Sequence, residues 1–120
     1  MWDLAGELTP KQVELLLRSM PVGFAVADEN DVVRFWAGPG FETCDRDLIG
    51  RPMLAWHPAQ ARAGVQALLE DFRSGAKDVV DSVQGAERII YSALRDEDGT
   101  YRGALETVIP LMGEGVSPAV

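Results

Sequence analysis

The first part of the chain has the hydrophobic spacing of a helix. Between residues 13 and 20, valine, leucine and methionine recur every three or four positions, which places them on one helical face. Thr9 and Pro10 before them are typical of an N-cap and a first helical position, and Pro21 ends the pattern. The sequence therefore predicts an amphipathic N-terminal helix within residues 1–20.

Segments with strand composition lie on both sides of the middle of the chain. Residues 22–26 alternate larger hydrophobic with small side chains, and residues 32–36 resume strand composition after the polar run 28–31, which is typical of a turn. These two segments predict a hairpin. Three further strands are expected in the second half, the last two joined by an aspartate-rich turn that ends in glycine; they cover residues 79–83, 88–94 and 101–111.

The longest helical pattern begins at Pro58 and ends at Ser74 and Gly75. With Pro58 in the first helical turn, hydrophobic residues occupy one face and charged residues the others. Before this helix, residues 44–53 predict only short helical turns, because glycine and proline interrupt the pattern. The hydrophobic face consists of Ala61, Val65, Leu68, Leu69 and Phe72.

The order of these elements predicts an α+β fold. Two strands, central helices and three final strands form a five-stranded antiparallel sheet with helices covering one face, and a small ligand has room between this face and the long helix. A chain of 120 residues closes one hydrophobic core. We therefore expect a single domain over residues 21–112, after the N-terminal helix of residues 1–20 and before a flexible polar tail over residues 113–120.

Composition and charge narrow the classes of function. With 19 acidic and 11 basic residues the net charge is -8, which repels nucleic acid and anionic lipid, so we expect neither nucleic acid nor a membrane as partner. No apolar run approaches the roughly 20 residues of a membrane span, and the N-terminus lacks the signal-peptide pattern; a cytoplasmic protein is expected. Cys44 is the single cysteine, and its acidic neighbours disfavour a reactive thiolate.

Three stretches in combination resemble the PAS superfamily of sensor domains. They are residues 20–35, the Leu-Ile-Gly-Arg-Pro segment of residues 48–52, and the stretch from Arg95 to Gly103. The resemblance covers residues 15–111 and implies the PAS fold and a role in signal transduction. The segment 56–58, Trp-His-Pro, and the helix that follows it resemble two PAS subgroups more narrowly. One accompanies hemerythrin-like domains in bacterial proteins, and the other is the haem-binding module of bacterial carbon monoxide-sensing transcription regulators.

His57 is the only histidine, and it stands at the entrance of the long helix on the side of its hydrophobic face. In the carbon monoxide regulators the corresponding histidine ligates haem iron. The resemblance therefore implies that this chain binds haem b through His57 as metal ligand, and senses a diatomic gas or redox state. Gly64, in the helix interior, leaves space for a flat ring. The other candidate haem-binding residues are Trp56, Val65, Leu68 and Ile90, with Arg62, Arg51 and Arg88 as candidate partners of the propionates.

The opposite side of the iron is expected to be open. In the carbon monoxide regulators, a methionine from the strand after the long helix can be the second protein ligand of the iron. Here the predicted strands at residues 79–83 and 88–94 contain no methionine. Met53 and Met112 remain possible donors, although methionine is more often a core residue. The predicted distal wall consists of Val80, Ile89, Ile90 and Leu105.

Two other interpretations stay open. A histidine before proline at a helix start can be a capping or hinge residue, and Gly64 can serve close packing of helix on sheet. The alternative function is a haem-free PAS interaction module, with an empty or organic-ligand pocket, that forms a homodimer through the N-terminal helix, where Leu15, Leu16 and Leu17 offer apolar surface.

We expect no enzymatic activity. No phosphate-binding glycine loop and no catalytic triad pattern is recognisable. Glu87 and Glu106 can approach one another across neighbouring strands, but no nucleophile accompanies them. The acidic residues 96–98 are typical of a hairpin turn and lack the spacing of a calcium loop.

Overall fold

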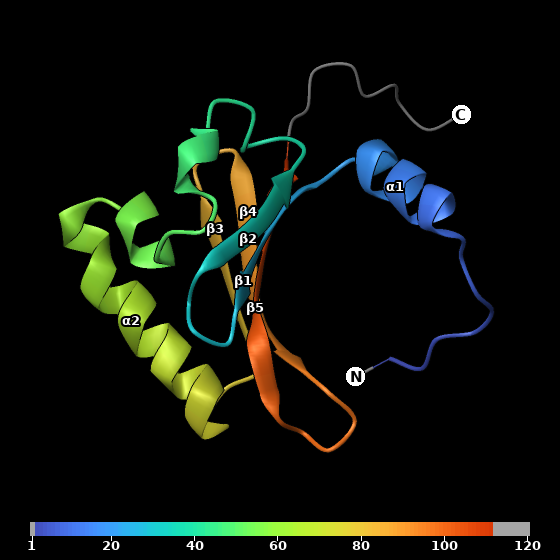
Figure 1. Ribbon diagram of the computed structural model, residues 1–120. Coiled ribbons are helices and arrows are strands. Elements are labelled where there is room, and N and C mark those ends of the chain that lie inside the picture. Colours follow the sequence, from blue (N-terminus) through green and yellow to red (C-terminus); the bar gives the residue numbers. More distant parts are fainter. Residues whose placement is uncertain (1, 112–120) are drawn as a thin grey trace.

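A five-stranded antiparallel sheet forms the centre of the protein (Figure 1). The computed structural model describes residues 2–111, and the strands follow the spatial order β2-β1-β5-β4-β3. All four neighbouring pairs are antiparallel, which confirms the predicted α+β fold. The strands are β1 (Gly23–Asp28), β2 (Val33–Ala37), β3 (Val79–Gln84), β4 (Glu87–Arg95) and β5 (Tyr101–Pro110).

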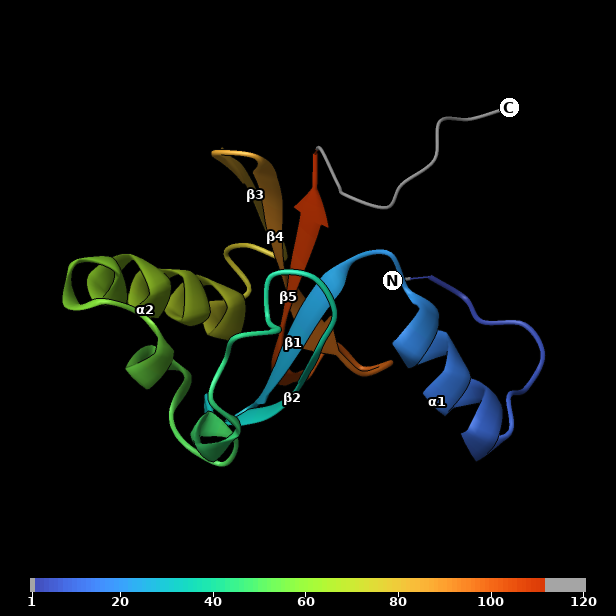
Figure 2. The ribbon, with the colours of Figure 1, turned by 90° about the horizontal axis from the view of Figure 1, so that it is seen from above.

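Helices lie on both sides of this sheet. The long helix α2 (Ala59–Ser74) and the short turns η1 (Arg46–Leu48) and η2 (Met53–Trp56) cover one face. Figure 2 shows α2 on one side of the sheet and the N-terminal helix α1 (Pro10–Ser19) on the other. Within residues 2–111, neither helix combines the length and hydrophobicity that a membrane span requires.

The main hydrophobic core lies between the second half of α2 and the sheet. Phe72 and Leu69 are fully buried, and they pack with Met53 and with Ala27 and Ala104 of the two central strands. Small alanine side chains on β1 and β5 leave room for the large residues of the helix. The hydrophobic face predicted for α2 thus provides the core, but only its C-terminal half is fully buried.

Each predicted helix and strand is present within about two residues of its expected bounds. Thr9 and Gln12 form a reciprocal capping box at the start of α1, which stabilises the first turn. The expected place of Pro58 was wrong: it precedes α2 as the N-cap residue, with an extended conformation (φ -61, ψ 153). The predicted tail of residues 113–120, like Met112, lies outside the described residues.

Candidate ligand-binding site

A hollow of about 380 Å³ opens between the first half of α2 and the sheet. This volume lies within the range of roughly 300–1,000 Å³ that is usual for small-molecule sites. We call it the His57 hollow, because His57 lines it where η2 meets α2. Ala61, Gly64, Val65 and Leu68 form its helix wall, and Val80, Ser82, Gln84, Ile89, Tyr91 and Glu106 form its sheet wall.

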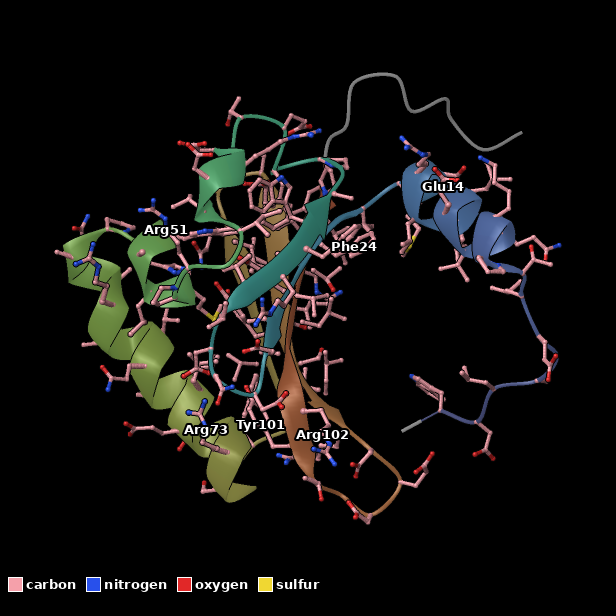
Figure 3. The ribbon with its side chains drawn as sticks, in the orientation of Figure 1. Glu14, Phe24, Arg51, Arg73, Tyr101 and Arg102 are labelled. Atoms are coloured by element: carbon pink, nitrogen blue, oxygen red, sulfur yellow. The ribbon has the colours of Figure 1, made fainter. Side chains whose placement is uncertain are left out.

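The hollow exists because α2 is fixed to the sheet at its C-terminal end. Arg73 donates hydrogen bonds to the carbonyl of Glu29 and to the carboxylate of Asp31, and its guanidinium lies 5.3 Å from the ring centre of Tyr101 (Figure 3). Arg95 on β4 donates to the carbonyl of Phe72. In the first half of the helix, the described side chains form one hydrogen bond, from Arg62 to the carbonyl of His57, and none to a strand; Val65 packs at the edge of the core.

His57 has one ring nitrogen fixed and the other available. Its Nδ1 lies 3.2 Å from the carbonyl oxygen of Met53, and because a carbonyl only accepts, Nδ1 carries the proton in this hydrogen bond. Nε2 then keeps its lone pair, as in histidines that bind a metal or accept from a ligand. The half-buried imidazole is therefore oriented by the backbone and has an acceptor to offer.

The predicted propionate cations do not line the hollow. Arg62 is exposed, and its Nε donates to the carbonyl oxygen of His57 at 3.0 Å. Arg88 is paired with Asp81, and Arg51 has an exposed side chain. Of these three, Arg62 alone is placed at the entrance of α2, where it stabilises the backbone on either side of Pro58.

The predicted distal wall needs a correction. Successive residues of a strand point to opposite faces, so Ile90 lies on the opposite face of the sheet from its neighbours Ile89 and Tyr91, which line the hollow. Leu105 lines a separate hollow of about 470 Å³ on that opposite face. Only Val80 and Ile89 of the four predicted wall residues line the His57 hollow.

Trp56 belongs to the core rather than to the lining. Its ring meets that of Trp36 edge-on with centres 4.8 Å apart, and it lies 6.3 Å from the ring of Phe41. The indole Nε1 is buried without a hydrogen-bond partner in the described structure. Trp56 thus packs against Trp36 and links η2 to β2, and it is not among the residues that line the His57 hollow.

Gly64 borders open space. A Cβ atom built on Gly64 would have no atom within 4 Å, so the interpretation that this glycine allows close packing of the helix on the sheet is wrong. The bare backbone instead widens the hollow on its helix wall. This is consistent with a flat occupant lying against α2.

A polar pair on the sheet wall was not predicted. Glu106 on β5 lies directly opposite Tyr91 on β4, and the hydroxyl of Tyr91 donates to Oε1 of Glu106 at 3.0 Å. Burial raises the pKa of Glu106, against the opposing effects of this hydrogen bond and of His57. The predicted approach of Glu87 to Glu106 fits this register, since both residues face the same side of the sheet and the charge of Glu87 further raises the pKa of Glu106. Alternation along the two strands could have placed Tyr91 and Glu106 on one face.

Comparison with known proteins places this geometry in a family. A family model described as "PAS domain" matches residues 13–111. The chain belongs to the PAS domain family. Members of the PAS family are in general sensory rather than catalytic modules. None of the curated proteins matches the chain.

Solved structures support the same fold. The C-terminal domain of a protein from Streptococcus mutans superposes with a TM-score of 0.80 at 24% identity, over 92% of this chain and 91% of that one. A sensory box sensor histidine kinase from Vibrio cholerae gives 0.56 at 14% identity, over 81% and 86%. Vibrio cholerae VqmA gives 0.63 at 20% identity over 88% of this chain, which spans about half (53%) of VqmA.

Proposed function

We propose that this PAS domain binds haem b in the His57 hollow through His57, and that it senses a diatomic gas or redox state. The observation that carries the proposal is the orientation of His57: Nδ1 bonds to the Met53 carbonyl, and the ring borders a hollow in which Gly64 adds open space. Haem iron requires an axial donor such as imidazole and an apolar slot for the macrocycle.

The chain's own residues divide the work of holding such a group. His57 would hold the iron through Nε2, while the Met53 carbonyl keeps its ring in one tautomer. Val65 and Leu68 offer apolar contacts to the flat face, and Arg62 at the helix entrance is the candidate partner for a propionate. Bound haem would supply an iron centre that takes up a diatomic gas or changes oxidation state.

Reconstitution with haemin tests this function. The purified chain is expected to show a Soret band that shifts on reduction and again on addition of carbon monoxide. His57→Ala should weaken haemin affinity at least about tenfold, since even the loss of a supporting contact to a metal ligand costs about 10- to 100-fold. Gln60→Ala, on the exposed side of α2, is the matched control and should bind as the natural chain does. An unaltered spectrum in the His57 variant would reject His57 as the ligand.

A second candidate function is a haem-free module that dimerises through α1. The specific observation is that α1 has no buried residue among its ten, and Leu15 and Leu16 are 49% and 52% exposed. An amphipathic helix normally buries its apolar face, and a second copy of α1 provides a matching apolar surface. VqmA, similar in fold, is described as a dimer.

Sedimentation of a colourless preparation tests the dimer. Leu16→Glu places a charge on the apolar face of α1 and should raise the dimer dissociation constant about tenfold or more. Ser19→Glu adds the same charge at an exposed polar position of the same helix and should leave association nearly unchanged. A monomer at every concentration, or equal effects of the two changes, would reject the α1 interface.

A further inference from the structure

The sheet wall of the His57 hollow carries a carboxyl group, that of Glu106, without an ion-pair partner in the described structure. Among residues 2–111, no lysine or arginine forms an ion pair with Glu106, whose one hydrogen-bond partner is Tyr91. No lysine or arginine lines the hollow either. A carboxylate that has lost part of its hydration is stabilised by a cation or by hydrogen-bond donors. Glu106 therefore offers a binding site for a cation or for a group that donates hydrogen bonds.

Tyr91 and His57, the polar groups of the hollow next to Glu106, have no proton left to donate to an occupant, whereas Ser82 and Gln84 further along the sheet wall still have donors. Tyr91 gives its single proton to Oε1 of Glu106, so the hydroxyl oxygen has only acceptor lone pairs left. His57 commits its Nδ1 proton to Met53, which leaves Nε2 as an acceptor. Oε2 of Glu106 has no hydrogen bond in the described structure. An occupant that satisfies these three groups has to supply the N–H or O–H donors itself.

The rest of the lining defines the body of the occupant. Val65 and Leu68 on the helix wall face Val80 and Ile89 on the sheet wall, and two apolar walls suit a flat ring. The net charge of the whole chain, -8, also attracts cations toward an open site, in addition to the carboxyl group of Glu106. A planar ring with a charged N–H group combines these features.

We propose that the haem-free protein binds a planar organic cation with N–H donors, such as an aryl amidinium or an aminopyridinium, in the His57 hollow through Glu106 and Tyr91. Two N–H groups of the cation bond to the free Oε2 of Glu106 and to the hydroxyl oxygen of Tyr91, and the ring packs against Val65 and Leu68. This site goes beyond haem binding, because its anchor lies on the sheet wall and does not need His57.

Calorimetric titration of the haem-free full chain with benzamidine tests the proposal. Benzamidine should saturate one site. Benzamide, a neutral molecule of the same shape, should bind at least about tenfold more weakly. Glu106→Gln keeps the acceptor for Tyr91 but removes the charge, and should weaken benzamidine binding about 10- to 100-fold. Glu70→Gln removes the same charge from an exposed position of α2 outside the hollow and should change the affinity less than about twofold.

The outcomes separate this site from haem binding. Glu106→Gln should still bind haemin, because His57 and its hydrogen bond to the Met53 carbonyl are unchanged. Absence of saturable benzamidine binding, or equal losses in the Glu106 and Glu70 variants, would overturn the cation site and leave the haem proposal standing. A haemin spectrum unaffected by His57→Ala would overturn the haem proposal and leave the cation site standing.

Discussion

Replacement of Phe72 by alanine is expected to lower the free energy of unfolding by about 3–5 kcal/mol. The side chain is 0% exposed and lies at the centre of the cluster that joins α2 to β1 and β5. Its removal costs the transfer free energy of the ring and leaves a cavity that the alanines of the neighbouring strands are too small to fill. A domain of this size has about 5–15 kcal/mol in total, so the variant keeps only part of its stability.

Urea denaturation followed by circular dichroism measures this loss. The matched control is Phe35→Ala, because Phe35 on β2 is 36% exposed and contacts Phe24 with ring centres 5.6 Å apart. The control should cost less than half as much, since less apolar surface returns to water. If the two changes lowered the free energy of unfolding equally, the contact of Phe72 with the sheet would not be the main hydrophobic core.

Gly103→Ala is the second change with a large expected effect, about 3 kcal/mol or more of lost stability. Gly103 has φ 146, a conformation that residues with a Cβ rarely adopt. A Cβ atom there would lie 2.1 Å from the carbonyl oxygen of Ala27. Because Gly103 pairs with Asp28, the clash would push β1 and β5 apart at the centre of the sheet.

Gly99→Ala separates the clash from the backbone strain. Gly99 also has a positive φ, 84, but a Cβ atom there meets nothing within 4 Å. This control should lose only about 1–2 kcal/mol, the cost of the left-handed conformation for a residue with a side chain. Thermal unfolding of both variants decides the matter, and similar losses would exclude a close contact between β1 and β5 as the cause.

The fold could be predicted because local patterns and packing agree in this chain. The apolar residues of α2 follow the spacing of a helix throughout, and they pack against a single surface, one face of the sheet. Leu69 and Phe72 were therefore correctly expected in the core. The turn at residues 28–31 is stabilised by Asp28, whose carboxylate accepts from the backbone N–H of Asn30 and Val32. Such short-range hydrogen bonds are encoded in adjacent residues and are therefore visible in the sequence.

The site was less predictable, because it depends on which face each strand residue occupies. Ile89 and Ile90 are adjacent and equally hydrophobic, so composition could not tell which of them points to α2. Glu106 was expected to approach Glu87, and only the register of β4 and β5 brings it opposite Tyr91. Arg62 lies on α2 close to His57, and its guanidinium donates to the carbonyl oxygen of His57, a contact that composition alone does not show.

The helix α2 is hydrogen-bonded to the rest of the domain mainly at its C-terminal end, so its two ends are held differently. The C-terminal end of α2 is held by the hydrogen bonds of Arg73 and Arg95. The N-terminal half, which begins at Ala59 close to His57, has no such hydrogen bonds to the sheet among the described residues. An occupant of the hollow would lie against this half of the helix. Trp56, just before α2, meets Trp36 edge-on and so connects this end of the helix to β2 at the edge of the sheet.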